Sequence, residues 1–391
     1  MRILLFTDLC IRPDQLFWHR DLGLLTKAFR ELGHEAWLVV HPASESPSKI
    51  KNPKSKISND PVIWASTSDV RNPSWWQSQK PDLIILGLWT RPKYDPIRRA
   101  ALSATPRVIE RADSDGMRTA SCGLLTYAKR RYDYFRDRTY RWPALVSIPA
   151  SLLYSLSSIL ATPWIEARLA RSLRLLPAVA VETTHATTLW KSLAAKIGAD
   201  PGRIHRIPHP IQTDIFRPGP SSAKKNRIIS VGRWESHQKN LPLLLKTLTG
   251  FLDLNPGWSS VVVGSGLPRN PPHPQIQLFG RLPAHALARR MRASKIYLSS
   301  SRYESFGIAA AEAALCACRV AAPRGCIPWW TGAVSNQVAV DLSVNLQKAS
   351  TRRPPSRSAC LKIHRRLNPL EIAQKMLRIS RLPRVPTPLP R

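Results

Sequence analysis

The sequence predicts an α/β protein with two doubly wound parallel sheets in tandem. The first forty residues alternate strand, helix and strand, which is how a parallel sheet with right-handed crossovers begins. The same alternation restarts near residue 227, after a segment rich in Pro and Gly. With 391 residues, the chain is long enough for two domains that each bury a core.

The first half of the chain supplies the first sheet. Residues 2–7 form an apolar run, and residues 22–32 repeat apolar side chains at helical spacing before Gly33. The other elements expected here are strands 36–40, 62–65, 83–88, 108–109 and 179–182 and helix 186–197. The first turn lacks a Gly-x-Gly-x-x-Gly pattern, so we expect no dinucleotide site there.

The second half repeats the pattern after a Pro-rich loop, 198–227. The elements expected there are strands 227–231, 260–263, 275–279, 295–299 and 320–322 and helices 241–254, 284–293 and 306–315. Residues 331–365 look short for the closing elements of such a domain. The predicted divisions are 1–220, 221–365 and a tail of 366–391 that holds a helix over 369–378.

The charge of the chain is strongly unbalanced. A formal net charge of +34 and an isoelectric point near 11.0 predict affinity for polyanions, whether nucleic acid, anionic lipid or phosphorylated substrates. The charge is spread over loops and both predicted domains, and no nucleic-acid-binding module is evident. We therefore expect no specific nucleic-acid partner, and a basic nucleic-acid-binding protein is the weaker alternative.

Two adjoining segments favour a membrane surface as a partner. Residues 127–142 interleave basic and aromatic side chains, and residues 143–165 carry no charge. Three prolines in the second segment weaken a membrane span, so we expect an apolar helix that is either buried or lies on a membrane. Basic and aromatic residues beside an apolar face attract anionic lipid, although such a run is often only the exposed face of a helix.

The cysteines and the amino terminus indicate a reducing compartment. Six cysteines are scattered along the chain, which does not resemble a disulfide scaffold. Cys316, Cys318 and Cys326 cluster but match no common zinc spacing, so we expect buried thiols and no metal. The segment MRILLFTDL reads as a first strand. We expect a cytoplasmic protein that lies peripherally on the inner face of the cell membrane.

One stretch joins a polar loop, a helix of small residues and an apolar strand: SRYESFGIAAAEAALCACRVAAP, residues 301–323. Ser305 is the expected N-cap of a helix over 306–315. A helix that begins beside Gly307 leaves its first N–H groups unpaired and presents a positive dipole end. Such an end suits a phosphate or another anion.

Two glutamates bracket this helix start. Glu304 precedes the helix, and Glu312 lies about two turns inside it. Eight residues of helix would separate them by roughly 12 Å, which is too far for the paired carboxylates of a hydrolase. They suit two separate parts of one elongated, phosphate-bearing ligand.

Two cations are expected at the same sheet edge. Strand 227–231 ends in GRWESHQKN, which places Arg233 and Lys239 between the strand end and the next helix. A cationic pair beside a helix amino terminus can hold a diphosphate and stabilise the charge that builds as it leaves. Either residue alone would be an ordinary surface charge.

Four segments together carry a family resemblance: IPHPIQTDIFRP, VGRWESHQKNLPLLLKTL, IQLFGRL and SRYESFGIAAAEAALCACRVAAP. In this order they resemble the carboxyl-terminal half of the GT-B glycosyltransferases of family 4. The resemblance implies two Rossmann-like domains that face a central cleft. It also implies retaining transfer of a sugar from a nucleotide-sugar donor to a saccharide or lipid-linked acceptor.

The resemblance also implies site residues. Arg233 and Lys239 would bind the donor diphosphate, and Glu304 would contact the transferred sugar. Amides near Phe306 and Gly307 would approach the sugar or phosphate, and Glu312 would accept hydrogen bonds from the ribose. No cofactor beyond the donor substrate and no metal are implied, and helix 369–378 would cross back to the first domain.

In the first domain the sequence offers acceptor-side candidates only. Asp113 and Asp115 follow a predicted strand in ERADSDG, and His185 lies in AVETTHA. A solvated turn and a structural histidine are the alternatives.

The chain also departs from the family pattern. No glycine-rich first loop is evident around residues 8–14, and Ala317 and Arg319 stand where Gly and Pro are common. We attribute the latter two to packing. A catalytically impaired GT-B-like binding protein is therefore the main alternative function.

Overall fold

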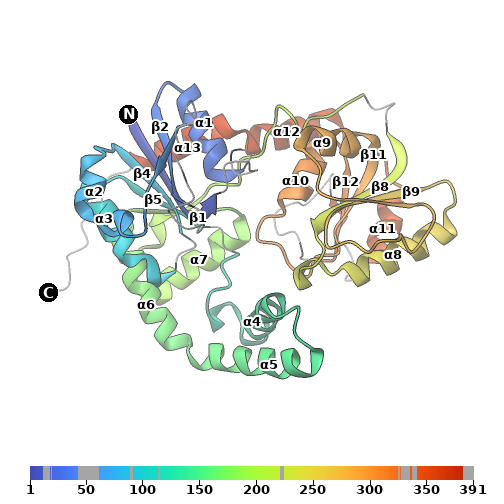
Figure 1. Ribbon diagram of the computed structural model, residues 1–391, viewed down its shortest axis with the longest axis horizontal. Coiled ribbons are helices and arrows are strands. Elements are labelled where there is room, and N and C mark those ends of the chain that lie inside the picture. The colour runs from blue at the N-terminus through green and yellow to red at the C-terminus, as the bar shows by residue number, and fades with distance from the viewer. Residues whose placement is uncertain are drawn as a thin grey trace. The chain divides into compact units, whose positions relative to one another are not determined.

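A computed structural model describes residues 1–11, 18, 20–42, 61–88, 91–112, 115–220, 224–324, 326, 335–336 and 341–381. Contacts within the chain divide it into two compact units. Unit 1 consists of Met1–Gly116, Pro163–Gln212 and Asn368–Arg391, and unit 2 of Met117–Thr162 and Thr213–Leu367. Each unit holds one parallel sheet flanked by helices (Figure 1), which confirms the predicted fold class.

The sheet of unit 1 has the strand order β3-β2-β1-β4-β5-β6-β7, with all neighbours parallel. Its strands are β1 (Arg2–Ile11), β2 (Glu35–Pro42), β3 (Val62–Trp64), β4 (Leu83–Gly87), β5 (Val108–Ala112), β6 (Ala178–Val181) and β7 (Ile204–Arg206). Its helices are α1 (Asp21–Glu31), α2 (Pro73–Ser78), α3 (Asp95–Ala104), α6 (Thr162–Leu175), α7 (Thr184–Lys196) and α13 (Pro369–Ser380). The chain winds outward in both directions from β1 and β4, as in doubly wound folds.

Alternate side chains of β1 enter two cores, one on each face of the sheet. Leu4 and Phe6 join a cluster with α2, α3, α6 and α7, whereas Ile3 and Leu5 join a cluster with α1 and α13. Both faces of this sheet are therefore covered, as parallel sheets require. Because α13 packs against α1, the last described helix belongs to unit 1.

The sheet of unit 2 has the strand order β10-β9-β8-β11-β12-β13 and is also parallel. Its strands are β8 (Lys225–Arg233), β9 (Ser259–Ser265), β10 (Ile276–Phe279), β11 (Ser294–Leu298), β12 (Arg319–Ala321) and β13 (Ser335–Asn336). The helices around it are α8 (Leu241–Leu254), α9 (Ala284–Ala293), α10 (Ile308–Leu315), α11 (Leu342–Ser350) and α12 (Arg357–Leu367). Leucines of α8 and α11 build the core on one face, and α10 packs with α9 and α12 (Figure 1).

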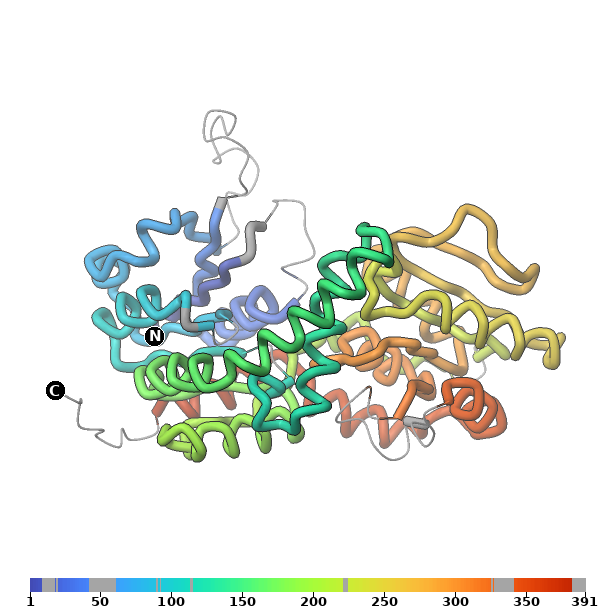
Figure 2. The backbone as a smooth tube through the Cα atoms, turned by 90° about the horizontal axis from the view of Figure 1, so that it is seen from below, coloured from blue at the N-terminus to red at the C-terminus, as the bar shows by residue number. Residues whose placement is uncertain are grey.

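Unit 2 also contains a helical hairpin from the middle of the chain. Its helices, α4 (Leu124–Arg138) and α5 (Ala144–Leu160), lie side by side (Figures 1 and 2). α4 contacts the short 3-10 helix η8 (His237–Lys239). Unit 1 therefore differs from the predicted first domain, 1–220, because the contacts of α4 place residues 117–162 in unit 2.

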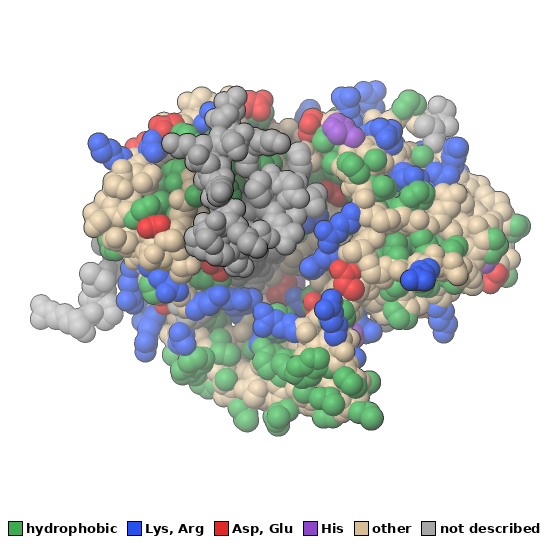
Figure 3. Space-filling view, viewed as in Figure 1, with side chains coloured by type: hydrophobic (Ala, Val, Ile, Leu, Met, Phe, Trp, Pro, Cys, Tyr) green, Lys and Arg blue, Asp and Glu red, His purple; other side chains and the backbone are tan. Residues whose placement is uncertain are grey.

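α5 does not bury its apolar side. Its serines are buried, while most of its leucines are exposed and form part of the hydrophobic surface seen in Figure 3. Of the two alternatives for 143–165, the buried apolar helix is therefore wrong, and a helix that lies on a membrane stays a prediction. No single helix among the described residues is long and apolar enough to cross a membrane. The pair formed by α5 and α6 reaches the required length and composition, but the two helices are bent by 61° relative to each other.

One further prediction needs correction, because the loop expected over 198–227 contains β7. Residues 331–365, which look short for the closing elements of a domain, hold α11 and most of α12. Glu110, the first acid of ERADSDG, is fully buried in β5 and pairs with Arg98 over 2.5 Å. It is a structural charge and does not face a ligand edge.

Candidate functional site

The strand order of unit 2 defines a switch point in its sheet. β8 and β11 are neighbours, and the chain winds away from them in opposite directions. In open parallel sheets, ligands bind outside the carboxyl ends of the strands at such a point. The loops that border it follow Arg233 and Leu298, and they carry Lys239 and Glu304.

Lys239 and Glu304 meet at this switch point. Nζ of Lys239 donates to Oε1 of Glu304 over 2.5 Å, and Oγ of Ser301 donates to the same oxygen over 2.7 Å. The lysine and glutamate side chains are only 17% and 13% exposed. The structure thus brings together two predicted site residues that lie 65 positions apart in the sequence.

Hydrogen bonds to backbone groups hold the two loops together independently of this ion pair. Ser300 Oγ donates to the carbonyl of Lys239 over 2.7 Å. The amide of Arg302 donates to the carbonyl of Gln238, and the side-chain amide of Gln238 donates to the carbonyl of Tyr303, both over 2.8 Å. The position of Lys239 relative to Glu304 is therefore set by the fold.

Arg233 ends β8 and is exposed. In the described parts of the chain its side chain has no ion-pair partner. The neighbouring strand approaches this end closely, because a Cβ on Gly264 of β9, at φ +143°, would lie 1.8 Å from the carbonyl oxygen of Gly232. Arg233 is thus an exposed cation, without an ion pair to the described residues, at a strand end that requires glycine beside it.

The helix after Glu304 starts two residues later than predicted. Its N-cap is Gly307, in the left-handed region at φ +82°, and α10 begins at Ile308. Ser305 is therefore not the cap, because the chain turns into the helix at the glycine. Phe306 is 1% exposed and anchors the loop in the core, so the free amides of the helix start lie beyond it.

Glu312 lies in the second turn of α10 and is half-buried. Burial raises the pKa of the buried Tyr297 phenol on β11, and the carboxylates of Glu304 and Glu312 raise it further. Both predicted carboxylates therefore act electrostatically on the same buried phenol of β11.

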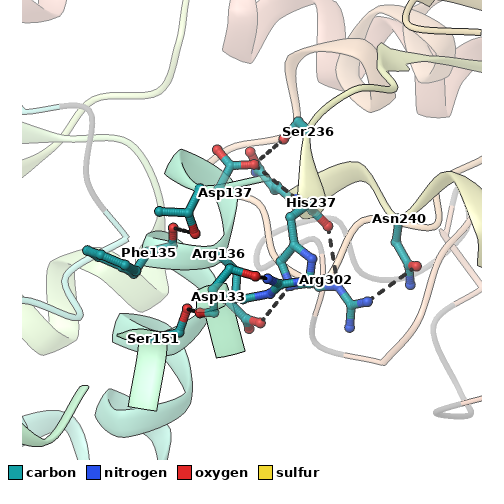
Figure 4. A network of polar contacts seen from close by, with 12 residues as sticks. Asp133, Phe135, Arg136, Asp137, Ser151, Ser236, His237, Asn240 and Arg302 are labelled. Carbon is teal, nitrogen blue, oxygen red and sulfur yellow. Dashed lines mark hydrogen bonds and ion pairs between the residues drawn. The ribbon is translucent and has the colours of Figure 1, made fainter. Parts of the chain in front are cut away.

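The hairpin contributes two acidic residues to this region, and neither was predicted from the sequence as a site residue. Asp137 of α4 accepts hydrogen bonds from Ser236 Oγ over 2.5 Å and from the amide of Gln238 over 3.2 Å. Asp133 lies 3.3 Å from Nε2 of His237 (Figure 4). One face of α4 thus holds η8, which carries Lys239.

A third contact joins α4 to the other loop. The guanidinium carbon of Arg130 lies 3.3 Å from the ring centroid of Tyr303, the residue before Glu304. Arg130, Asp133 and Asp137 follow helical spacing, so this face was visible in the sequence as two acids within a basic run.

A separate pocket of about 230 Å³ lies between the end of α4 and the start of α8, and its lining includes Arg136, Tyr140, Arg302 and Pro242. Its lining contains neither Lys239 nor Glu304. We do not place the ligand of the switch point there.

The acceptor-side candidates belong to unit 1. Asp113 lies outside the described residues. Asp115 follows β5, and His185 is exposed in the first turn of α7, which follows the neighbouring strand β6. Gly116, at φ +82°, packs so closely on α7 that a Cβ would lie 2.8 Å from that of Leu189. Asp115 and His185 therefore share one sheet edge.

Unit 1 also contains a buried charge cluster that the sequence did not predict. Nε2 of His209 lies 2.7 Å from Oε1 of Glu182, and its Nδ1 lies 3.5 Å from Oδ1 of Asp21. Arg111 pairs with Asp21 and donates to the carbonyl of Pro208 over 3.0 Å. Burial lowers the pKa of His209, but the two carboxylates outweigh it and raise the pKa to about 9. His209 is therefore protonated at neutral pH.

The clustered cysteines are core residues. Cys316, Cys318 and Cys326 are buried free thiols, and Sγ of Cys318 donates to the carbonyls of Met291 and Ser294. Burial raises the pKa of Cys318, so this thiol stays protonated. Within the described ranges, no group of three or more His, Cys, Asp or Glu is placed to hold a metal.

The fold of the two units is that of the GT-B class. HepE from Anabaena, solved in complex with UDP and glucose, has a TM-score of 0.59 at 14% identity, covering 97% of this chain and 98% of that one. Sucrose-phosphate synthase from Thermosynechococcus elongatus has a TM-score of 0.60 at 15% identity, covering 97% and 98%. At these identities the likeness shows the fold.

A sequence match covers part of the chain. Residues 211–326 match the model described as glycosyl transferases group 1, in agreement with the resemblance of the motifs to glycosyltransferases. A D-inositol 3-phosphate glycosyltransferase from Acidothermus cellulolyticus is 29% identical over 168 residues, which are 36% of this chain and 37% of that protein. The match thus spans little more than a third of that relative. The family match over 211–326 covers both loops of the switch point in unit 2.

Proposed function

We propose that this protein is a retaining glycosyltransferase that moves a sugar from a nucleotide-sugar donor to a saccharide or lipid-linked acceptor. The observation that carries the proposal is the meeting of Lys239 and Glu304 at the switch point of unit 2. The group 1 match over 211–326 and the UDP and glucose bound by HepE support a nucleotide-sugar donor.

The cations act on the diphosphate. When the bond between the sugar and the diphosphate breaks, the nucleoside diphosphate leaves with the electron pair and gains negative charge. Lys239, Arg233 and the free amides at the start of α10 stabilise that charge, and such pre-placed groups lower the barrier to bond breaking. The proposal needs no cofactor beyond the donor substrate and no metal.

The carboxylates act on the sugar and the nucleoside. Glu304 contacts the transferred sugar, and the amides near Phe306 and Gly307 approach the sugar or phosphate. Glu312, further along α10, accepts hydrogen bonds from the ribose hydroxyls. On the acceptor side, Asp113, Asp115 and His185 of unit 1 are the proposed contacts. We place the reaction in the cytoplasm, on the inner face of the cell membrane.

Thermal shift with nucleoside diphosphates and their sugar conjugates tests the donor assignment, because a ligand of the folded state raises its apparent stability. At least one conjugate should raise the unfolding temperature of the wild type. Arg233→Ala and Lys239→Ala should lose that shift, whereas the control Lys246→Ala, at a position of α8 away from the switch point, should keep it. A full shift in both site variants overturns the assignment.

A further inference from the structure

α5 is an amphipathic helix with its polar side turned inward. Its buried residues, Ser147, Ser151, Ser155 and Ser158, recur at helical spacing on one face. They receive the arginines of α4: Arg131 Nε donates to Ser158 Oγ over 3.2 Å, and Arg136 donates to Ser147. Ser155 in turn donates to the carbonyl of Ala128 over 2.8 Å. The hairpin is held together by a polar seam.

The opposite side of α5 is apolar and open to solvent. We define this outer face by six exposed residues, Leu145, Val146, Leu152, Leu153, Leu156 and Leu160. Leu145, Leu153 and Leu160 are 90%, 69% and 73% exposed. A contiguous apolar patch of this kind is unusual on the surface of a soluble protein and marks a binding face. Figure 3 shows hydrophobic side chains gathered over α5.

The charges of the hairpin that remain exposed are all basic. Both of its acids, Asp133 and Asp137, bind η8, whereas Lys129, Arg138 and Arg141 lie at the surface. Two exposed aromatic residues, Tyr140 and Trp142, lie in the turn between the helices. Basic and aromatic side chains beside an apolar face are the complement of anionic lipid head groups above an acyl layer.

We propose that the outer face of α5 docks on the surface of an anionic phospholipid bilayer. The leucines enter the boundary between head groups and acyl chains, and Arg138 and Arg141 contact the head groups. α5 lies in this boundary because its 17 residues extend roughly 26 Å, less than the hydrocarbon core of about 30 Å. The next helix cannot complete a span, because Leu169 and Leu173 of α6 are buried in the core of unit 1.

Flotation of the full chain with phospholipid vesicles tests the proposal. Because the net charge of +34 alone attracts anionic vesicles, the variants must leave the charge unchanged. In vesicles with about a third anionic lipid, Leu152→Gln/Leu153→Gln/Leu156→Gln should bind at least tenfold more weakly than the wild type. The matched control, Leu254→Gln/Val344→Gln/Leu361→Gln, changes three apolar residues that are 82%, 40% and 47% exposed elsewhere on unit 2 and should bind as the wild type does.

Two further arms distinguish docking through α5 from donor binding and from general charge attraction. Lys239→Met/Glu304→Gln, which removes the ion pair without changing the net charge, should float normally, since docking does not depend on the donor site. In vesicles without anionic lipid, the wild type should bind at least tenfold more weakly.

Equal flotation of the triple variant and the wild type overturns the proposal, because it leaves only general charge attraction. The proposal is also overturned if the wild type does not bind vesicles but forms a dimer, and the triple variant does not form that dimer. The outer face would then be a contact between copies of the chain.

Discussion

Lys239 and Glu304 neutralise each other across 2.5 Å at the switch point of unit 2. In the proposed reaction, a diphosphate that enters must take over Lys239 as its partner. Glu304 keeps the hydrogen bond from Ser301 when this happens, so its carboxylate stays in position for the sugar. The ion pair therefore holds both charges ready while no donor is bound.

Replacing Glu304 with Gln should separate donor binding from turnover. Glu304→Gln removes the charge that competes for Lys239, so nucleoside diphosphate should bind as tightly as to the wild type or more tightly. Release of nucleoside diphosphate from the donor should fall at least about a hundredfold, because the sugar loses a charged partner. Calorimetry and a product-release assay measure the two quantities. Glu371→Gln, at an exposed position of α13, is the control, and normal turnover of Glu304→Gln contradicts its role.

The contact between α4 and η8 should tune donor affinity. Asp133→Asn keeps the size of the side chain but removes the charge facing His237, so η8 and Lys239 should be held less firmly. We expect nucleoside diphosphate to bind roughly three- to tenfold more weakly, about 1 kcal/mol. Asp253→Asn is a matched control, because Asp253 also lies 3.3 Å from a histidine, His273. Equal losses in both variants would show that η8 is positioned without α4.

The His209 cluster should make the stability of unit 1 depend on pH. The folded-state pKa of about 9 lies above the ordinary 6.5, so His209 adds stability that is complete below about pH 6.5 and is lost as the pH rises through 9. The contribution is of order 3 kcal/mol. His209→Gln should therefore lower the unfolding temperature at about pH 6 by several degrees and have little effect at about pH 9.5. A pH-independent difference would rule out the charged histidine.

Ala317 should accept glycine with a gain in stability. Its φ of +60° is left-handed, and the amides of Ala317 and Cys318 bond back to the carbonyls of Ala314 and Ala313, the Schellman end of a helix. We expected the alanine at this position, where the family commonly has glycine, to reflect a difference in packing. Instead, Ala317 adopts a left-handed backbone conformation that costs free energy for a residue with a Cβ. Ala317→Gly should stabilise unit 2 by about 0.5–1 kcal/mol in thermal unfolding. Ala286→Gly, within α9, should destabilise it by a similar amount.

The regular elements of unit 2 could be predicted because their patterns are local. The predicted helices over 241–254 and 284–293 agree with α8 and α9 at both ends. The start of α10 was misplaced because Ser305 satisfies the local rule for a cap, whereas the fold buries Phe306 and turns at Gly307. The joint placement of Lys239 and Glu304 followed from the rule for strand ends.

The contacts that no local pattern predicts are those between distant segments. Asp21, Arg111, Glu182 and His209 come from four parts of the chain, and only the folded sheet brings them together. For α5 the sequence left open whether its apolar side is buried or lies on a membrane. The serines recur at helical spacing, but leucine is usually the buried side chain, so the spacing alone did not show that the serines form the buried side.

Phosphorus NMR of a nucleoside diphosphate tests the central claim, that Lys239 and Arg233 hold the donor diphosphate in unit 2. Using the diphosphate of the best conjugate from the thermal screen, the wild type should shift and broaden the β-phosphate resonance. Lys239→Ala and Arg233→Ala should each weaken that binding at least tenfold, and Lys246→Ala should leave it unchanged. A β-phosphate resonance that responds equally to the wild type and to Lys239→Ala would contradict the account.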